Sequence, residues 1–393
     1  MLDELQQLVD DLATELQRSV AVDDVAIQLL AASAHYGAID PPRIDSVLAR
    51  RADAAIVAHV RTFGIDHAVD PVHIPDSAEL RTLPRIAVPL RDGSDLYGFL
   101  WLIDADPPVT PSELTMATKG ARAITELLRH NAAQLDDLQA QDTPLLAGLF
   151  GDDRARRDAA LAAVTGPDRL GPGASLRIAA IRFRDGDGDT AEAARHAVTR
   201  SVALRQLIGP ALVAPVGGYL AVVSRAGPRP PSAAWRERFW STARAAEPAL
   251  AVGLADQLPG EPPGPSFGRA AYAADVAQRV GEFDGFACWT ELGAWQLLFG
   301  LPWTPATARE LHPPLAPLLR PEHRLLATTL LTYLDSGGDA AATVAALHIH
   351  RTTLYYRMDK IRDLVGSSWS TGTGRLGAHA ALVLATRLAP ADA

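Results

Sequence analysis

The chain has 393 residues, which is more than one hydrophobic core usually organises, so two or three domains are expected. Its net charge of −9 argues against a cationic protein that coats nucleic acid over its whole surface. No apolar run approaches the roughly 18 residues of a membrane span, the acidic N-terminus is unlike a secretory signal, and a single cysteine excludes an intramolecular disulfide. The composition therefore predicts a soluble, cytoplasmic, multi-domain protein.

Residues 1–141 are predicted to form an α/β domain that ends in a long helix. The first helix is amphipathic, since Leu5, Leu8 and Leu12 recur at intervals of three or four residues. Strands are predicted for residues 25–32, 85–90 and 97–103. The last two strands flank a polar loop of hairpin type, so they are expected to pair with each other.

The long helix of this region is predicted for residues 112–140, and it carries an apolar stripe at approximately heptad spacing. The stripe consists of Leu114, Ala117, Ala121, Ile124, Leu128, Leu135 and Leu138. Two interpretations fit this spacing: the stripe packs on the domain's own sheet, or it forms the seam of a parallel dimer. The same helix is our candidate for coupling the first region to the rest of the chain.

Residues 142–290 alternate between strand and helix patterns. Strands are predicted for residues 176–183, 211–215, 219–224 and 250–254, and helices for residues 191–208, 232–246 and 267–280. A tight hairpin turn is expected at residues 216–218, where two glycines follow a valine. The resulting β-α-β-β-α-β order is typical of ferredoxin-like or cyclase-like α+β domains.

Residues 291–321 are predicted to link this region to a C-terminal domain. The Pro-rich stretch 312–321 is expected to act as a semi-stiff spacer. Residues 322–393 contain only short helical patterns, so they are predicted to form an all-α domain.

Two helices joined by a very short turn stand out in this last domain. An amphipathic helix at 325–334 is followed by Asp339, a good N-cap for a short Ala-rich helix at 340–347. Three residues turn the chain, and a longer helix is predicted to begin near His350. Small residues on the short helix allow close packing, so the pattern indicates a helix-turn-helix.

The helix that begins at His350 has the residue pattern of a DNA-reading helix. One narrow face is apolar, and the first turn and a half is basic, polar and aromatic, without acids. Carboxylates there would be repelled by phosphates, whereas Arg and His can donate to guanine. The candidate DNA-binding residues are His350, Arg351, Thr352, Thr353, Tyr355, Tyr356, Arg357 and Lys360. The alternative on spacing alone is a solvated helix in an ordinary bundle.

The run from residue 347 to residue 366 resembles the C-terminal helix-turn-helix of the PucR/CdaR family of bacterial transcriptional regulators. The family pattern is Leu-x-(Ile/Val)-His-Arg-Asn-Thr-Leu-x-Tyr-Arg, with a Gly one helix later. The matching residues are Leu347, Ile349, His350, Arg351, Thr353, Leu354, Tyr356, Arg357 and Gly366, whereas Thr352 stands where the family has Asn. The resemblance implies sequence-specific binding to double-stranded DNA.

Resemblances to the same family extend upstream. Residues 142–290 are similar to its GGDEF-like domain, but Tyr219 and Leu220 stand where a working cyclase needs acidic residues to hold metal, so this domain is expected to be catalytically dead. Residues 1–141 are similar to a GAF-type sensor domain, which implies a possible small-molecule effector. The resulting fold class is multi-domain α+β: a GAF-like α/β sensor, a ferredoxin/GGDEF-like α+β domain and an all-α helix-turn-helix domain.

The sequence therefore predicts a dimeric, effector-responsive transcriptional regulator without catalytic residues, metal site or cofactor. Two alternatives remain open: a nucleotide-cyclase-like signalling enzyme, and a protein-interaction scaffold that does not bind DNA. The distribution of charge is compatible with DNA binding, because residues 320–390 hold eight basic and five acidic side chains, a net +3. The remaining residues carry −12, which should limit non-specific DNA coating.

Overall fold

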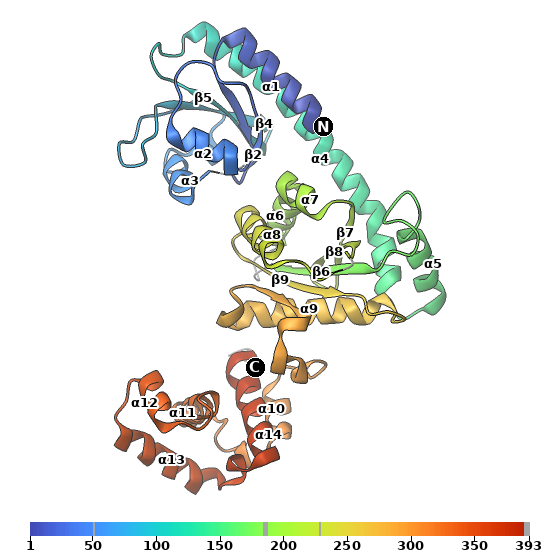
Figure 1. Cartoon of the computed structure of the whole chain (residues 1–393), viewed down its shortest axis with the longest axis vertical. Coiled ribbons are helices and arrows are strands. Elements are labelled where there is room, and N and C mark those ends of the chain that lie inside the picture. The colour runs from blue at the N-terminus through green and yellow to red at the C-terminus, as the bar shows by residue number, and fades with distance from the viewer. Residues whose placement is uncertain (50–51, 184–187, 228, 389–393) are drawn as a thin grey trace. The chain divides into compact units, whose positions relative to one another are not determined.

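The computed structural model describes residues 1–49, 52–183, 188–227 and 229–388 (Figure 1). The chain divides into two compact units, one made of Met1–Leu250 with Asp256–Phe267 and the other of Ala251–Ala255 with Gly268–Ala393. Within the described ranges, no helix combines the length and the apolar character that crossing a bilayer requires.

The N-terminal region contains a five-stranded antiparallel sheet with the strand order β2-β1-β5-β4-β3. Its strands are β1 (Val20–Asp23), β2 (Leu29–Ala32), β3 (Val72–Ile74), β4 (Arg85–Asp92) and β5 (Asp95–Ile103). Its helices are α1 (Leu2–Leu16), α2 (Pro41–Ala49), α3 (Ala54–Arg61) and the first half of α4 (Pro111–Phe150). The predicted hairpin of β4 and β5 is confirmed, with Arg85 opposite Ile103 and Asp92 opposite Asp95.

The strand predicted for residues 25–32 is wrong in its first half. The chain forms β1 before that range and then turns, and only β2 lies inside it. The Asp24 carboxylate accepts hydrogen bonds from the backbone N–H groups of Ala26 and Gln28, both at 2.9 Å, and Ile27 adopts a φ of 58°. An aspartate that bonds its own following backbone favours a turn over a continuous strand.

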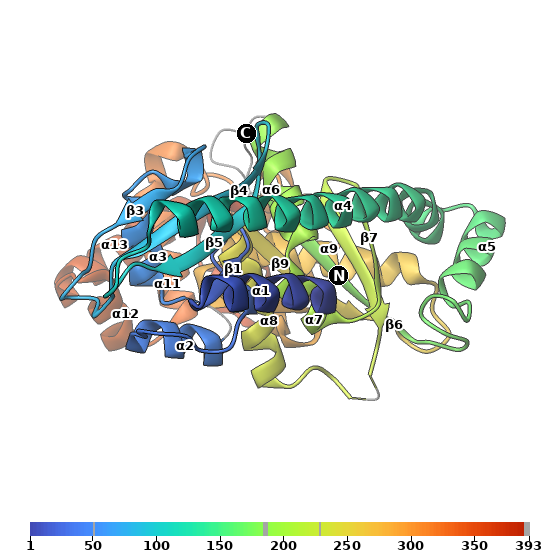
Figure 2. The same cartoon turned by 90° about the horizontal axis from the view of Figure 1, so that it is seen from above.

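Both faces of this sheet are buried under helices. Alternate residues of each strand point to opposite sides, so each strand contributes to two cores. In β5, Leu100 and Leu102 belong to the core under α1 and α4, whereas Phe99 and Trp101 belong to the core under α3. Figure 2 shows α1 alongside α4 on the first face. In contrast to these helices, α2 buries none of its side chains.

The apolar stripe of α4 packs within the chain, as the first of the two interpretations predicts. Ala117, Ala121, Ile124 and Leu128 lie in the core shared with α1 and the sheet. Only the last stripe residue, Leu138, is an exposed large side chain, with 47% of its surface accessible. The face proposed as a dimer seam is therefore covered by the chain itself over most of its length.

The helix α4 runs ten residues beyond its predicted end at 140, so the predicted domain boundary between residues 141 and 142 falls inside a continuous helix. Asp142 is 5% exposed and explains the extension. Its carboxylate pairs with Arg169 at 2.5 Å and accepts a hydrogen bond from the backbone N–H of Val213 at 3.0 Å. These contacts hold the second half of α4 against the middle region, and Pro144 is tolerated within it.

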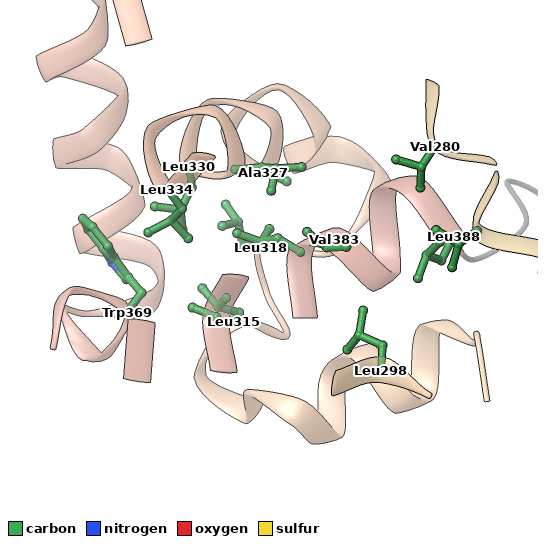
Figure 3. Close-up of a cluster of buried hydrophobic side chains, with 14 of the residues drawn as sticks. Val280, Leu298, Leu315, Leu318, Ala327, Leu330, Leu334, Trp369, Val383 and Leu388 are labelled. Carbon is green, nitrogen blue, oxygen red and sulfur yellow. The ribbon is translucent and has the colours of Figure 1, made fainter. Parts of the chain in front are cut away.

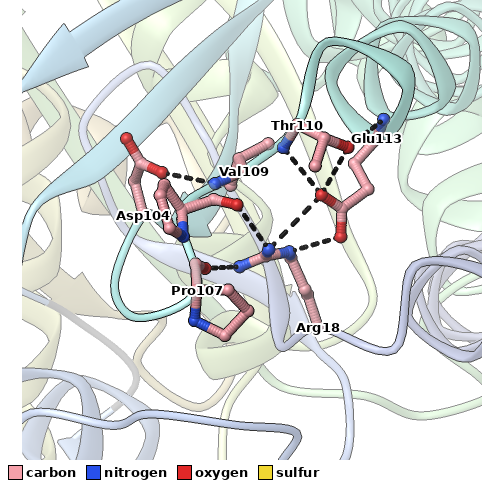
Figure 4. Close-up of polar contacts among 7 residues, drawn as sticks. Arg18, Asp104, Pro107, Val109, Thr110 and Glu113 are labelled. Atoms are coloured by element: carbon pink, nitrogen blue, oxygen red, sulfur yellow. Dashed lines mark hydrogen bonds and ion pairs between the residues drawn. The ribbon is translucent and has the colours of Figure 1, made fainter.

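A network of polar contacts fixes the start of α4 to the end of α1 (Figure 4). Arg18 donates to both carboxylate oxygens of Glu113, at 2.8 and 3.3 Å, and to the carbonyl oxygens of Pro107 and Pro108, each at 3.0 Å. Glu113 and Thr110 form a capping box at the same helix end. A bidentate guanidinium contact of this kind is directional as well as strong.

We expect Glu113→Gln to lower the free energy of unfolding at neutral pH by about 1–2 kcal/mol, because the charge-assisted bond to Arg18 is lost. Hydrogen bonds from Arg18 and then Thr110 lower the pKa of Glu113 from 4.5 to about 2. The stabilisation is thus present above pH 4.5 and is lost as the pH falls toward 2. Urea unfolding at pH 7 and pH 3, followed by circular dichroism, should show a smaller acid effect in the variant.

The control for this experiment is Glu79→Gln, which neutralises an exposed carboxylate of the same region. It should leave the unfolding curves at both pH values close to those of the wild type. A Glu113→Gln protein as stable as the wild type at pH 7 would show that the network contributes nothing to the fold.

The middle region contains a second five-stranded sheet with the strand order β10-β9-β6-β8-β7. Its strands are β6 (Leu176–Phe183), β7 (Ala211–Val216), β8 (Tyr219–Arg225), β9 (Leu250–Asp256) and β10 (Phe286–Cys288). Its helices are α5 (Arg154–Val164), α6 (Gly188–Arg200), α7 (Val202–Ile208), α8 (Ala233–Ala246) and α9 (Pro263–Arg279). The predicted β-α-β-β-α-β order is present, and Gly217 and Gly218 make the predicted hairpin turn with φ values of 56° and 83°.

One predicted helix of this region is divided in two. The range 191–208 was expected to be continuous, but α6 ends at Arg200 and α7 begins at Val202. Ser201 lies between them in an extended conformation, and its side chain accepts a hydrogen bond from the backbone N–H of Leu204. A serine that caps the next helix in this way favours a break over a continuous helix.

The C-terminal helices lie in the second compact unit, and the residues before them share their core. The helices are α10 (Pro305–Leu311), α11 (Arg324–Asp335), α12 (Ala340–Leu347), α13 (Arg351–Val365) and α14 (Gly372–Val383). Residues 312–321, predicted to be a spacer, instead contribute Leu315 and Leu318 to the core, both 0% exposed (Figure 3). The prediction is wrong because two leucines in the Pro-rich stretch have an apolar partner surface to bury against.

Candidate nucleic-acid interface

The predicted helix-turn-helix is present as α12, a short turn and α13. Asp339 caps α12 as predicted, because its carboxylate accepts hydrogen bonds from the backbone N–H groups of Ala341 and Ala342 at 2.6 and 3.0 Å. The helix ends at Leu347, and the next residue, His348, adopts a left-handed φ of 52°. His350 is extended and precedes α13 as its N-cap residue. The turn is short because a left-handed residue reverses the chain within one position.

The apolar face of α13 is the one that the periodicity predicts. Leu354, Met358, Ile361 and Val365 are all buried, with exposed fractions from 0 to 8%. They belong to the core cluster that also holds residues of α11 and α14. The opposite face of α13 is consequently presented to solvent.

The structure places most of the predicted DNA-binding residues on this solvent face. Six of them are exposed: His350, Arg351, Thr352, Tyr355, Tyr356 and Lys360. Two are partly buried, Thr353 and Arg357. Among the described residues of the helix, the acids Asp359 and Asp363 follow only in its later turns, so the first turns carry no carboxylate.

Two cationic side chains of this face are held by neighbouring tyrosines. Arg351 donates to the hydroxyl of Tyr355 from Nε at 3.1 Å and from Nη2 at 2.9 Å, and its guanidinium lies 5.5 Å from the ring centroid. Lys360 lies 5.1 Å from the ring centroid of Tyr356, and a hydrogen bond to that tyrosine raises the pKa of the lysine. Each cation therefore lies against the aromatic ring of a residue one helical turn away, and both side chains remain accessible to solvent.

Arg357 points toward α11 instead of standing free on the surface. Its Nη1 donates to Oγ1 of Thr329 at 3.2 Å, and Thr329 is 0% exposed. The hydroxyl of Thr329 in turn donates to the backbone carbonyl of Leu325 at 2.8 Å. Arg357 thus positions α13 against α11. Sequence reasoning missed Thr329, whose only signal is a polar residue on the apolar face of α11.

A second polar contact joins α11 to α14. The carboxylate of Asp335 pairs with Nε2 of His379 at 2.8 Å and with Nη2 of Arg387 at 2.5 Å. Asp335 also ends α11, so one carboxylate fixes the helix end to the closing helix of the domain. The helix α13 is therefore mounted on a scaffold held by both apolar packing and ion pairs.

Comparisons with known proteins identify two domains in the chain. Residues 326–384 match the family described as the PucR C-terminal helix-turn-helix domain. Residues 4–126 match the GAF domain family. The chain contains a PucR-type helix-turn-helix and a GAF domain, as the sequence resemblances predicted.

Individual relatives match more weakly. The chain is 22% identical over 130 residues to the DNA-binding transcriptional activator AdeR of Bacillus subtilis (strain 168). This match covers 32% of the chain and 31% of that protein, so the matched part spans about a third of the length of this curated relative. A crystal structure of a regulator of polyketide synthase expression from Bifidobacterium adolescentis matches 61% of this chain and 89% of that one, at 16% identity and a TM-score of 0.26.

Proposed function

We propose that the protein is a transcriptional regulator that binds double-stranded DNA sequence-specifically, with α13 in the major groove. The observation that carries this proposal is the exposed first part of α13, which presents His350, Arg351 and two tyrosines without a carboxylate. Arg351 and His350 would read base edges, Tyr355 would orient Arg351, and Lys360 would contact phosphate. The match to the PucR-type helix-turn-helix supports the same reading.

We also propose that the regulator acts as a homodimer and responds to a small effector at its GAF domain. One helix-turn-helix buries limited surface, and two copies on a two-half-site operator supply the affinity that regulation needs. The effector would shift the population of DNA-competent arrangements of the two reading helices. In this proposal α4 carries the signal, because it is fixed to the GAF sheet at one end and to β7 through Asp142 at the other.

The middle domain is proposed to be a GGDEF-like module without cyclase activity. Leu220, at one of the two positions that need an acid in a cyclase, is 0% exposed in the sheet. The hydroxyl of Tyr219, at the other, accepts a hydrogen bond from Arg182 at 3.2 Å. Neither side chain can hold a divalent cation. Incubation with GTP and Mg²⁺ should therefore yield no cyclic or dimeric nucleotide, and turnover would favour the enzyme alternative.

The proposal is tested by titrating the full chain into labelled DNA from upstream of its own gene and into a scrambled duplex of equal length. We expect tighter binding to the upstream DNA at every salt concentration, with log affinity falling linearly as log salt rises. Equal affinity for the two duplexes would contradict sequence-specific reading. Absence of binding to both would favour the scaffold alternative, in which this face contacts protein.

A further inference from the structure

A small cavity lies in the GAF domain between the sheet and α2. Its volume is about 40 Å³, which is room for roughly three water-sized groups. One side is apolar, with Ile27, Ile56 and Val60. The other side is unusually polar for a protein interior, because Asp23 and Arg43 both line it.

One buried donor in this cavity lacks a hydrogen-bond partner among the described residues. Asp23 is 9% exposed and Trp101 is 8% exposed. The indole N–H of Trp101 approaches Asp23 closely enough to lower its pKa, yet it forms no hydrogen bond of normal geometry with any described residue. Buried polar groups are normally paired, so an unpaired donor beside a cavity calls for an acceptor from outside the chain.

Of the two arginines that line the cavity, only Arg85 pairs with a carboxylate among the described residues. Arg85 pairs with Asp40 at 2.5 Å, and Asp40 also accepts backbone hydrogen bonds from Arg43 and Leu83. The guanidinium of Arg43 donates to the carbonyl of Val20 at 2.9 Å and, within the described ranges, forms no ion pair with a carboxylate. When Asp23 is protonated, the site therefore holds one positive charge in excess.

We propose that this cavity binds a small monocarboxylate, whose oxygens accept hydrogen bonds from Trp101 and Arg43 and from the protonated carboxyl of Asp23. Three donors then converge on one anion, and the short apolar body of the ligand lies against Ile27 and Ile56. This inference rests on the effector response proposed above and names the chemical class of the effector.

Binding should be coupled to the uptake of one proton by Asp23. Burial and, to a smaller extent, the charge of Asp24 raise the pKa of Asp23 to about 7, despite the lowering effects of Arg43, Trp101 and Arg85. Asp23 is thus protonated in much of the protein near neutral pH, and it is ionised above that pH. An ionised Asp23 would repel a carboxylate, so affinity falls as the pH rises through 7.

A carboxylate of four to six non-hydrogen atoms exceeds the 40 Å³ of the cavity, so α2 has to shift outward to admit it. The helix can do so because it is held mainly by polar contacts. Arg43 and Ser46 of α2 line the cavity, whereas Ile44, Val47 and Leu48 are exposed, Leu48 by 79%. With no buried side chain, α2 can move with little loss of apolar contact. A carboxylate bound there gives Arg43 the anionic partner that it lacks among the described residues.

The test is isothermal titration calorimetry of the full chain with acetate, propionate and isobutyrate, from pH 5.5 to 8.5. Propionamide and propylammonium serve as uncharged and cationic analogues of similar size. We expect the carboxylates alone to bind, with affinity nearly constant below pH 6 and falling about tenfold per pH unit above 7. Carboxylates that fail to bind at every pH, or tighter binding of the amide or the amine, would overturn the proposal.

Variants separate the ligand contact from the integrity of the fold. Asp23→Asn keeps a hydrogen-bond donor but cannot ionise, so it should bind propionate at pH 8.5 as tightly as the wild type does at pH 6. A damaged fold cannot produce that gain. Arg43→Gln should abolish binding, whereas Asp95→Asn, an exposed change on the same sheet, should alter neither affinity nor pH dependence. A pH dependence that persists in Asp23→Asn would also contradict the assignment.

These measurements use no DNA, so the two proposals can fail separately. Carboxylate binding without DNA binding would refute the proposed regulator and leave the ligand site standing. DNA binding without carboxylate binding would refute the ligand class alone.

Discussion

Replacing Arg351 by alanine should weaken binding to the upstream DNA by about 1–3 kcal/mol while leaving affinity for scrambled DNA much less changed. Arg351 begins α13, is exposed, and carries no carboxylate partner among the described residues. Tyr355 holds it from Nε and Nη2, which limits the rotamers that the guanidinium must lose on binding. Fluorescence anisotropy with both duplexes at three salt concentrations measures the specificity ratio and the salt slope together.

Arg362→Ala is the matched control because it removes the same charge from the same helix. Eleven residues separate Arg362 from Arg351, so it lies at nearly the same angle on the helix but roughly 16 Å further along the axis. Its side chain already pairs with Asp359 at 2.7 Å. We expect a small loss common to both duplexes. A similar loss of specificity in the two variants would mean that α13 does not enter the groove by its first turns.

The helix α13 and its buried face could be predicted from sequence because their signals are local. Apolar spacing fixes the buried face of α13, and the Asp339 cap and the short turn fix where the helices begin. The contact between Arg357 and Thr329 could not be predicted, since it joins residues 28 positions apart on two packed helices. Local patterns therefore identify which face of a helix is exposed, but not which of its cationic side chains bonds a neighbouring helix.

In the GAF domain, too, local sequence patterns predicted some elements of the sheet correctly and others wrongly. Residues 85–103 read as a hairpin because both strands are apolar and the loop between them is polar. The turn after β1 was missed because Val25, Ile27 and Leu29 imitate a strand, while the carboxylate of Asp24 bonds the backbone into a turn. The helix α2 was also missed, although Ile44, Val47 and Leu48 lie at helical spacing; in the structure this short apolar face is exposed and α2 buries none of its side chains.

The Pro-rich stretch before the helix-turn-helix domain was predicted wrongly because its proline content was given more weight than its two leucines. Proline favours extended, solvated segments, and a spacer was the natural prediction. Proline is also accepted in the first turn of short helices, as at Pro313 in the 3₁₀ segment Pro313–Leu315. Once the backbone turns there, Leu315 and Leu318 reach the core of α11 and α14. Stability measurements can test how much this segment contributes to the core.

Leu318→Ala should destabilise the C-terminal unit by about 2–5 kcal/mol, because Leu318 is 0% exposed and its truncation leaves a cavity in the core that also holds Leu330 (Figure 3). Hydrogen exchange followed by mass spectrometry on the full chain should show faster exchange in α11 and α13 and unchanged exchange in β4 and β5. Leu325→Ala is the control, since that leucine is 60% exposed. If Leu318 belonged to a solvated spacer, both variants would exchange like the wild type. An effect confined to Leu318→Ala would show that the Pro-rich segment is part of the core on which α13 packs. A loss of DNA binding in this variant would then result from the weakened support of α13.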